Sequence, residues 1–259
     1  MSKIIVGNWK MNIGTRESIA LARAVLLSLR GKKTVPDVVV CPPFVALGEV
    51  RKAVAKSRVA LGAQNVFWED QGAFTGEVSP RMLVELGVSH VIIGHSERRG
   101  HLRETDDMVH AKVMAALRHR LTPILCVGET SEQRKRGEAE QVVADQVRAA
   151  LRHAKVGRER LLVAYEPIWA IGTGEAATPE DAVTMHELIR RVLQEELSAD
   201  AAAGTKILYG GSVDGTNAYA FLREPMVQGV LVGGASVKIT QFTEIVSAAI
   251  DAAEGEGTV

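Results

Sequence analysis

Residues 161–192 read LLVAYEPIWAIGTGEAATPEDAVTMHELIRRV and contain one complete strand-and-helix unit. The first five residues are apolar without alternation, which is typical of a parallel strand that is covered on both faces. Thr178 and Pro179 mark a helix start, because threonine caps helices and proline fits the first helical position. Met185, Ile189 and Val192 then recur at helical spacing. The stretch therefore predicts a buried strand, a loop and an amphipathic helix.

The same unit recurs along the whole chain. Further runs rich in Val, Ile and Leu cover residues 4–6, 37–41, 59–63, 90–93, 121–127, 206–209 and 230–232. Segments with helical spacing separate these runs, and no linker or low-complexity segment divides the chain. About eight such units in 259 residues predict an α/β fold, a single (β/α)8 barrel of parallel strands, as one domain over residues 1–259. In such a barrel the chemistry is expected at the C-terminal ends of the strands.

Composition excludes some classes of protein. The 31 basic and 31 acidic side chains cancel, which argues against a general nucleic-acid binder. Cys41 and Cys126 each adjoin an apolar run, so we expect buried, reduced thiols rather than a disulfide. No apolar stretch reaches about 18 residues, and the run at 4–6 is too short for a signal peptide. We therefore expect a cytoplasmic protein that does not bind membranes.

Ionisable residues and glycines follow five of the predicted strands. The runs are GNWKMN at 7–12, GHSERR at 94–99, EPIWAIGTG at 166–174, GGSV at 210–213 and GGAS at 233–236. Glycine lets backbone N–H groups approach an anion closely. No paired metal-ligand spacing such as HExxH occurs, so the sequence predicts no metal site.

These runs, extended to NWKMN, GHSERR, AYEPIWAIGTG, YGGSV and LVGGAS, resemble the triosephosphate isomerase family in content and order. The resemblance implies reversible conversion of dihydroxyacetone phosphate to D-glyceraldehyde 3-phosphate through an enediolate, without a cofactor. It assigns Glu166 as the base that moves the proton. His95 would be a neutral imidazole that hydrogen-bonds the substrate oxygen, and a helix start after it disfavours imidazolium. Lys10 and Asn8 would stabilise the enediolate oxygens.

The resemblance also implies supporting roles around this centre. The backbone N–H groups assigned to the substrate phosphate are those of Gly172, Ser212, Gly233 and Gly234. The residues assigned supporting roles are Glu97, which would orient Lys10, Ser96, and Tyr209, which would latch a lid over 167–177 near Ala177. Taken singly, such residues are more often a surface glutamate, a structural histidine, a solvated lysine or glycines of tight turns.

Residues 67–77 carry three aromatic side chains in a chain that has only 11. Exposed aromatic residues in a loop indicate an interface. The resemblance implies a homodimer in which Thr75 approaches Lys10 and His95 of the partner subunit. The sequence alone also permits a loop that folds onto its own barrel.

Some positions depart from the family pattern, and other functions stay open. Met226 and Gln228 stand where the family often has acidic residues, so an ion pair to Arg190 is expected to be missing. Glu175 begins a lid hinge that more commonly begins with lysine. The alternative functions are an isomerase of a four-carbon ketose phosphate, a lyase that forms a Schiff base through Lys10, and a phosphate-binding barrel without turnover.

Overall fold

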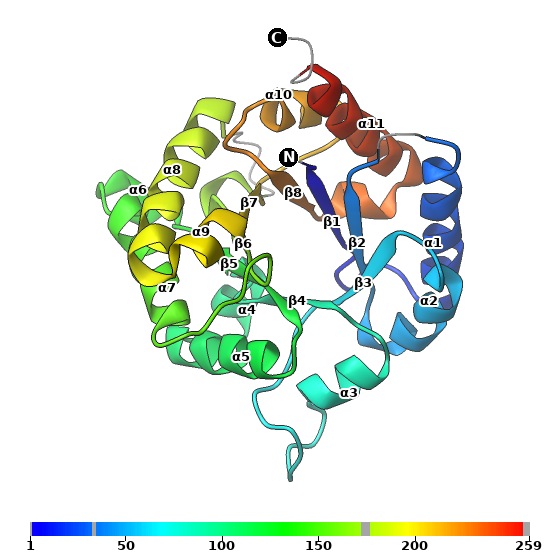
Figure 1. The fold of residues 1–259 in the computed structure, drawn as a ribbon, viewed down its shortest axis with the longest axis horizontal. Helices are drawn as coiled ribbons and strands as arrows, with labels where there is room; N and C mark the ends of the chain where they lie inside the picture. Colours follow the sequence, from blue (N-terminus) through cyan, green and yellow to red (C-terminus); the bar gives the residue numbers. More distant parts are fainter. Residues whose placement is uncertain (1, 33–34, 172–176, 256–259) are drawn as a thin grey trace.

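The computed structural model describes residues 2–32, 35–171 and 177–255, and its centre is a closed barrel of eight parallel strands (Figure 1). The strands are β1 (Ile4–Asn8), β2 (Asp37–Cys41), β3 (Val59–Ala63), β4 (His90–Ile93), β5 (Thr122–Val127), β6 (Leu162–Tyr165), β7 (Lys206–Tyr209) and β8 (Gly229–Val232). Each strand pairs with the next in sequence, and β1 closes the ring against β8. The predicted barrel and all eight predicted strands are confirmed.

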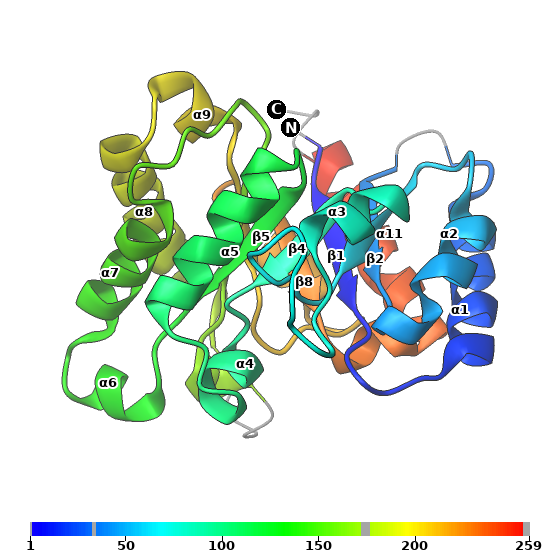
Figure 2. The ribbon, with the colours of Figure 1, turned by 90° about the horizontal axis from the view of Figure 1, so that it is seen from below.

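Helices surround the barrel on its outer side (Figures 1 and 2). They are α1 (Thr15–Leu29), α2 (Leu47–Val54), α3 (Pro80–Glu85), α4 (Ser96–His101), α5 (Asp106–Arg118), α6 (Ser131–Lys135), α7 (Ala139–Leu151), α8 (Pro179–Glu196), α9 (Ala199–Gly204), α10 (Ala218–Leu222) and α11 (Ile239–Gly255), with the 3-10 turns η1 (Phe44–Ala46), η2 (Ile168–Ala170) and η3 (Gly234–Val237). Among the helices described, none combines the length and the hydropathy needed to cross a lipid bilayer.

The helix start predicted at Thr178 is present at α8. The Thr178 hydroxyl accepts a hydrogen bond from the Asp181 backbone N–H at 3.1 Å, and the Asp181 carboxylate accepts one from the Thr178 N–H at 3.0 Å. This reciprocal cap satisfies two amide groups that the first helical turn leaves unpaired. Met185, Ile189 and Val192 all lie on the buried face of α8. The predicted amphipathic helix is therefore confirmed.

Each strand is buried on both faces. Alternate residues such as Ile4 and Val6 point into the barrel, where they meet a compact cluster that includes Cys41 and Cys126. The residue between them, Ile5, belongs to the larger core between the sheet and the helices. This double burial explains why the strands are continuously apolar. Both cysteines are free, as predicted, and burial raises the pKa of both thiols, so they stay protonated.

Arg190 joins α8 to the segments around α9 and β8 without an ion pair in the described structure. Its guanidinium donates to the Ala202 carbonyl, to the Thr205 carbonyl at 2.7 Å, and to the Gln228 side-chain oxygen at 2.8 Å. Burial lowers the pKa of Arg190. The glutamine thus accepts a hydrogen bond where a carboxylate would form an ion pair, in agreement with the departure noted in the sequence.

Replacing this arginine should weaken the fold. We expect Arg190→Met to lower the free energy of unfolding by about 2–4 kcal/mol, because three partly buried oxygens lose a charged donor. Urea denaturation measures the change. Arg191→Met is the matched control, since Arg191 is the next residue of α8 and is exposed. Equal losses in the two variants would show that the buried hydrogen bonds of Arg190 contribute nothing of their own.

Candidate active site

The C-terminal ends of the strands surround a cavity of about 450 Å³. In Figure 2 this end of the barrel faces downward, at the level of α4, whereas the N-terminus lies at the upper end. The predicted residues that line this cavity are Asn8, Lys10, His95, Glu166, Ser212, Gly233 and Gly234. Larger hollows of about 580 and 540 Å³ lie beside α10 and α11 and at the opposite mouth of the barrel. The chemistry of the lining, rather than size, therefore identifies the site.

Glu166 follows β6 directly and is held almost out of solvent, with 2% of its surface exposed. Its backbone N–H continues the sheet by donating to the Val127 carbonyl at 2.7 Å. Its Oε2 accepts a hydrogen bond from the Ser96 backbone N–H at 2.7 Å. The second oxygen, Oε1, is buried without an aligned hydrogen bond from any residue that the structure describes. A carboxylate oxygen that no aligned hydrogen bond occupies is suited to accept a proton from a bound molecule.

The His95 imidazole lies beside this carboxylate, with Nε2 at 3.1 Å from Glu166 Oε1. Its other ring nitrogen, Nδ1, accepts a hydrogen bond from the Glu97 backbone N–H at 3.2 Å. Because Nδ1 accepts this bond, Nε2 is the ring nitrogen left to carry a proton and donate it in a hydrogen bond. Nε2 is directed at Glu166 Oε1, and both side chains line the cavity.

The start of α4 holds both of these side chains. His95 is the residue that caps this helix, and Gly94 before it adopts φ +73°, which glycine tolerates and other residues rarely adopt. The first two helical amides, those of Ser96 and Glu97, donate to Glu166 and His95 respectively. The predicted helix start after His95 is present, whereas the supporting role of Ser96 stays a prediction.

Lys10 lies across the cavity and is paired with Glu97. Its ammonium nitrogen lies 2.5 Å from Glu97 Oε1. Partial burial by itself would raise the pKa of Glu97, but the hydrogen bond and the positive charge of Lys10 outweigh it and lower that pKa. The contact therefore joins an ionised carboxylate to the lysine, and the orienting role of Glu97 stays a prediction.

The backbone at Lys10 is strained and braced from two sides. Lys10 adopts φ 50°, a left-handed conformation that costs a residue with a side chain roughly 1–2 kcal/mol. Asn8, the last residue of β1, accepts a hydrogen bond from the Lys10 N–H at 3.2 Å. Gln64 donates from its amide to the carbonyl oxygens of Lys10 and Cys41, each at 2.9 Å. These bonds stabilise the turn that directs the Lys10 ammonium into the site.

Gly233, the first residue after β8, lies beside the Lys10 side chain. A Cβ atom at Gly233 would lie 3.2 Å from the Lys10 Cε, so a larger residue would crowd the lysine. Gly234 begins η3, and Ser212 donates from its hydroxyl to the Ala170 carbonyl at 2.8 Å. Gly172, the fourth residue assigned to the phosphate, lies outside the described residues. Three of the four positions are therefore brought to one side of the cavity.

The segment that leaves Glu166 is anchored by a buried carboxylate. Glu129 has no exposed surface, and its Oε1 accepts hydrogen bonds from Trp169 Nε1 at 2.7 Å and the Tyr165 hydroxyl at 3.0 Å. The Arg134 guanidinium lies 4.3 Å above the Trp169 ring. These contacts hold residues 168–170, where the predicted lid begins, whereas residues 172–176 of that lid are not described.

Tyr209 ends β7 and is buried, with its ring stacked on Phe221 at 4.2 Å. Burial raises the pKa of Tyr209, so its hydroxyl stays protonated and available as a donor. Ala177, where the latch is expected, is also buried. The latch itself stays a prediction, because its counterpart belongs to the lid.

Sequence reasoning did not identify Gln64 or Glu129. Like Glu166, both are polar residues that stand just after a strand. Gln64 comes directly after β3, and Glu129 comes two residues after β5. A polar residue just after a strand end is therefore the signal for both, even where no glycine-rich run follows. Within the described residues, no group of three or more His, Cys, Asp or Glu side chains could hold a metal ion.

Comparison with known proteins agrees with this geometry. The family model described as triosephosphate isomerase matches residues 3–249. The chain belongs to the triosephosphate isomerase family. It is 51% identical to the triosephosphate isomerase of Roseiflexus castenholzii, over 94% of this chain and 96% of the relative. It is 49% identical to that of Chloroflexus aurantiacus, over 94% and 97%, and 46% identical to that of Caldanaerobacter subterraneus, over 94% and 98%.

Family membership makes the residues of this cavity stronger candidates for catalysis than they are one by one. A strand-end glutamate, a capping histidine and a paired lysine are common features in isolation. In this chain the three groups line one cavity at the C-terminal ends of the strands, where (β/α)8 barrel enzymes have their active sites. The family resemblance inferred from five short runs is therefore confirmed, and the roles of the single residues follow as proposals.

Proposed function

We propose that this protein interconverts dihydroxyacetone phosphate and D-glyceraldehyde 3-phosphate, with Glu166 as base, and His95 and Lys10 as electrostatic partners. Glu166 removes a proton from the carbon next to the substrate carbonyl and returns it to the neighbouring carbon. The substrate passes through an enediolate, and no atom is gained or lost. The observation that carries this proposal is the 3.1 Å approach of His95 Nε2 to Glu166 Oε1 in the cavity that Lys10 also lines.

Each partner stabilises charge as it develops on the substrate oxygens. The N–H group at His95 Nε2 donates a hydrogen bond without bringing a charge of its own. The Lys10 ammonium, held by Glu97 and by the braced turn, supplies the positive charge, and Asn8 supports it. Because both donors are positioned before substrate binds, little reorganisation accompanies the reaction.

The phosphate group of the substrate is assigned to backbone N–H groups. Ser212, Gly233 and Gly234 lie on one side of the cavity, and Gly172 would complete the set from the lid. Closure of residues 167–177 would exclude water and prevent loss of phosphate from the enediolate. Tyr209 would hold the closed position. The reaction needs no metal ion or organic cofactor in this scheme, since proton transfer and electrostatic stabilisation supply its chemistry.

A coupled isomerase assay with the purified protein tests the reaction and its substrate. We expect turnover of both triose phosphates, and a preference for a four-carbon ketose phosphate would replace our substrate assignment. Borohydride trapping of a covalent adduct at Lys10 would favour the lyase instead. Phosphate binding without turnover of any sugar would indicate a non-catalytic barrel.

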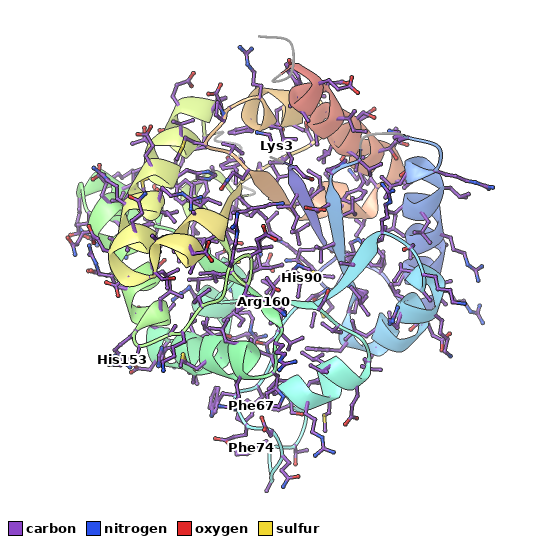
Figure 3. All side chains as sticks on the ribbon, viewed as in Figure 1. Lys3, Phe67, Phe74, His90, His153 and Arg160 are labelled. Atoms are coloured by element: carbon purple, nitrogen blue, oxygen red, sulfur yellow. The ribbon has the colours of Figure 1, made fainter. Side chains whose placement is uncertain are left out.

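We also propose a homodimer formed through the loop between β3 and α3. This loop extends away from the barrel, and Phe67 and Phe74 lie on it (Figures 1 and 3). Phe67 stacks on Trp68 at 4.1 Å and meets Phe74 at 4.6 Å, while Phe74 stays 44% exposed. An exposed aromatic cluster on a protruding loop is typical of a protein interface. Thr75 beside it would approach the partner's Lys10 and His95.

Phe74→Asp should dissociate this dimer. We expect wild-type protein to sediment at twice the chain mass and the variant to shift toward the monomer, because a buried charge at the interface centre has no partner. Tyr219→Asp is the matched control, since Tyr219 is 46% exposed but lies on α10. A monomeric wild-type protein, or equal sedimentation of all three proteins, would contradict the proposal.

We further place the protein in the cytoplasm and treat residues 1–259 as one domain. Both cysteines are free thiols, which a reducing compartment preserves. The last helix, α11, packs against α1 and α10 and so closes the helical ring around the barrel.

A further inference from the structure

The charges around the active-site cavity do not by themselves favour a doubly negative substrate. The acidic side chains of Glu166 and Asp214 line the cavity, and Lys10 is paired with Glu97. Hydrogen bonds from the Thr216 hydroxyl and backbone lower the pKa of Asp214, so it is ionised near neutral pH. The chain as a whole carries no net charge that could attract an anion from a distance.

Lys238 is the exception in this lining. It lines the same cavity, its side chain is exposed, and no carboxylate of the described residues forms an ion pair with it. Its ammonium is therefore not neutralised by a neighbour, unlike that of Lys10. An exposed charge at the rim of a cleft acts on an approaching ion before any contact forms.

The backbone around Lys238 fixes it on the phosphate side of the site. Lys238 follows η3, the turn that Gly234 begins, and its N–H donates to the Ala235 carbonyl at 3.2 Å. Its own carbonyl accepts the Phe242 N–H at 2.9 Å, within the first turns of α11. The lysine thus lies between the glycines assigned to the phosphate and the start of a long helix, whose N-terminus also favours an anion.

We propose that Lys238 recruits the phosphate group of the substrate and determines the preference of the site for a dianion. The inference rests on the proposed isomerase function. In it, Lys238 does not contact the enediolate and takes no part in the proton transfer. Lys238 attracts the phosphate toward Gly233 and Gly234 during the encounter. Lys10 and His95 then act at the reacting carbons.

This role predicts an effect on substrate capture rather than on chemistry. At an ionic strength of about 10 mM, where screening is weak, Lys238→Gln should lower kcat/KM by about three- to tenfold. Its kcat should stay within about twofold of wild type. The difference in kcat/KM should shrink at about 0.3 M salt, and Lys238→Arg should restore it. The inhibition constant of inorganic phosphate should rise in parallel for Lys238→Gln.

Lys155→Gln is the matched control, because it removes the same charge from an exposed lysine in the segment that leads to the N-terminal end of β6. Equal kcat/KM for Lys238→Gln and wild type at low salt would overturn the proposal. An equal loss in Lys155→Gln would show that only net charge matters, and a loss that salt does not change would indicate structural damage. If wild-type protein shows no isomerase turnover, the proposed function fails, while calorimetry with inorganic phosphate still tests Lys238.

Discussion

Glu166→Gln is expected to reduce kcat by about three orders of magnitude while inorganic phosphate still binds. The side-chain amide has almost the size of the carboxylate and keeps an oxygen that can accept the Ser96 N–H, while its NH2 group would face His95 Nε2. An amide cannot accept the substrate proton, however, and the enediolate then cannot form at a useful rate. Steady-state kinetics in the coupled assay and calorimetry with inorganic phosphate measure the two properties.

A control variant and a stability measurement distinguish loss of the base from loss of the fold. Glu187→Gln makes the same chemical change at an exposed position of α8 and should leave kcat unchanged. Equal melting temperatures of Glu166→Gln and wild type would show that the loss is not one of folding. Unchanged turnover in Glu166→Gln would refute the assignment of the base.

Lys10→Met should lower kcat/KM by about 10²–10³-fold, because the developing oxyanion loses its positive partner. The effect should be larger than that expected for Lys238→Gln, since Lys10 acts in the transition state and Lys238 acts in the encounter. Methionine keeps much of the length of the lysine side chain, so packing against Gly233 should survive. The coupled assay at saturating and at low substrate separates the losses in kcat and KM.

The partner of Lys10 supplies the control. Glu97→Gln should have a much smaller effect, because Glu97 acts by orienting the lysine through the 2.5 Å contact. The double variant should then be no worse than Lys10→Met alone, since the carboxylate has nothing left to orient. Losses that add on the logarithmic scale would show that Glu97 has a role independent of Lys10.

Much of the fold followed from local patterns. Continuous apolar runs identified the strands, and Thr178 with Pro179 identified the start of α8. Both signals are visible in the sequence because burial of a strand on both faces and capping of a helix each leave a pattern within a few neighbouring residues. The bounds of the strands were therefore within two residues of those observed.

The candidate site was predicted in part. Glu166, His95 and Lys10 stood directly after predicted strands, within runs that resemble one family. Gln64 and Glu129 also follow strands but lack a glycine-rich run, and their importance depends on partners that are distant along the chain. Glu129 bonds to Trp169, 40 residues away, and Gln64 bonds to Lys10, 54 residues away. Such contacts are not encoded in any local pattern.

The sequence by itself determined the number and type of the elements, the order of the strand ends, and the family. The tertiary structure alone decided which groups meet: the approach of His95 Nε2 to Glu166, the pairing of Lys10 with Glu97 across 87 residues, and the place of Lys238 in the lining of the cavity. The physical reason is the distance along the chain between the residues that interact. Periodicity and capping are local, whereas barrel closure brings eight strand ends to one cavity, where hydrogen bonds and charges depend on fractions of an ångström.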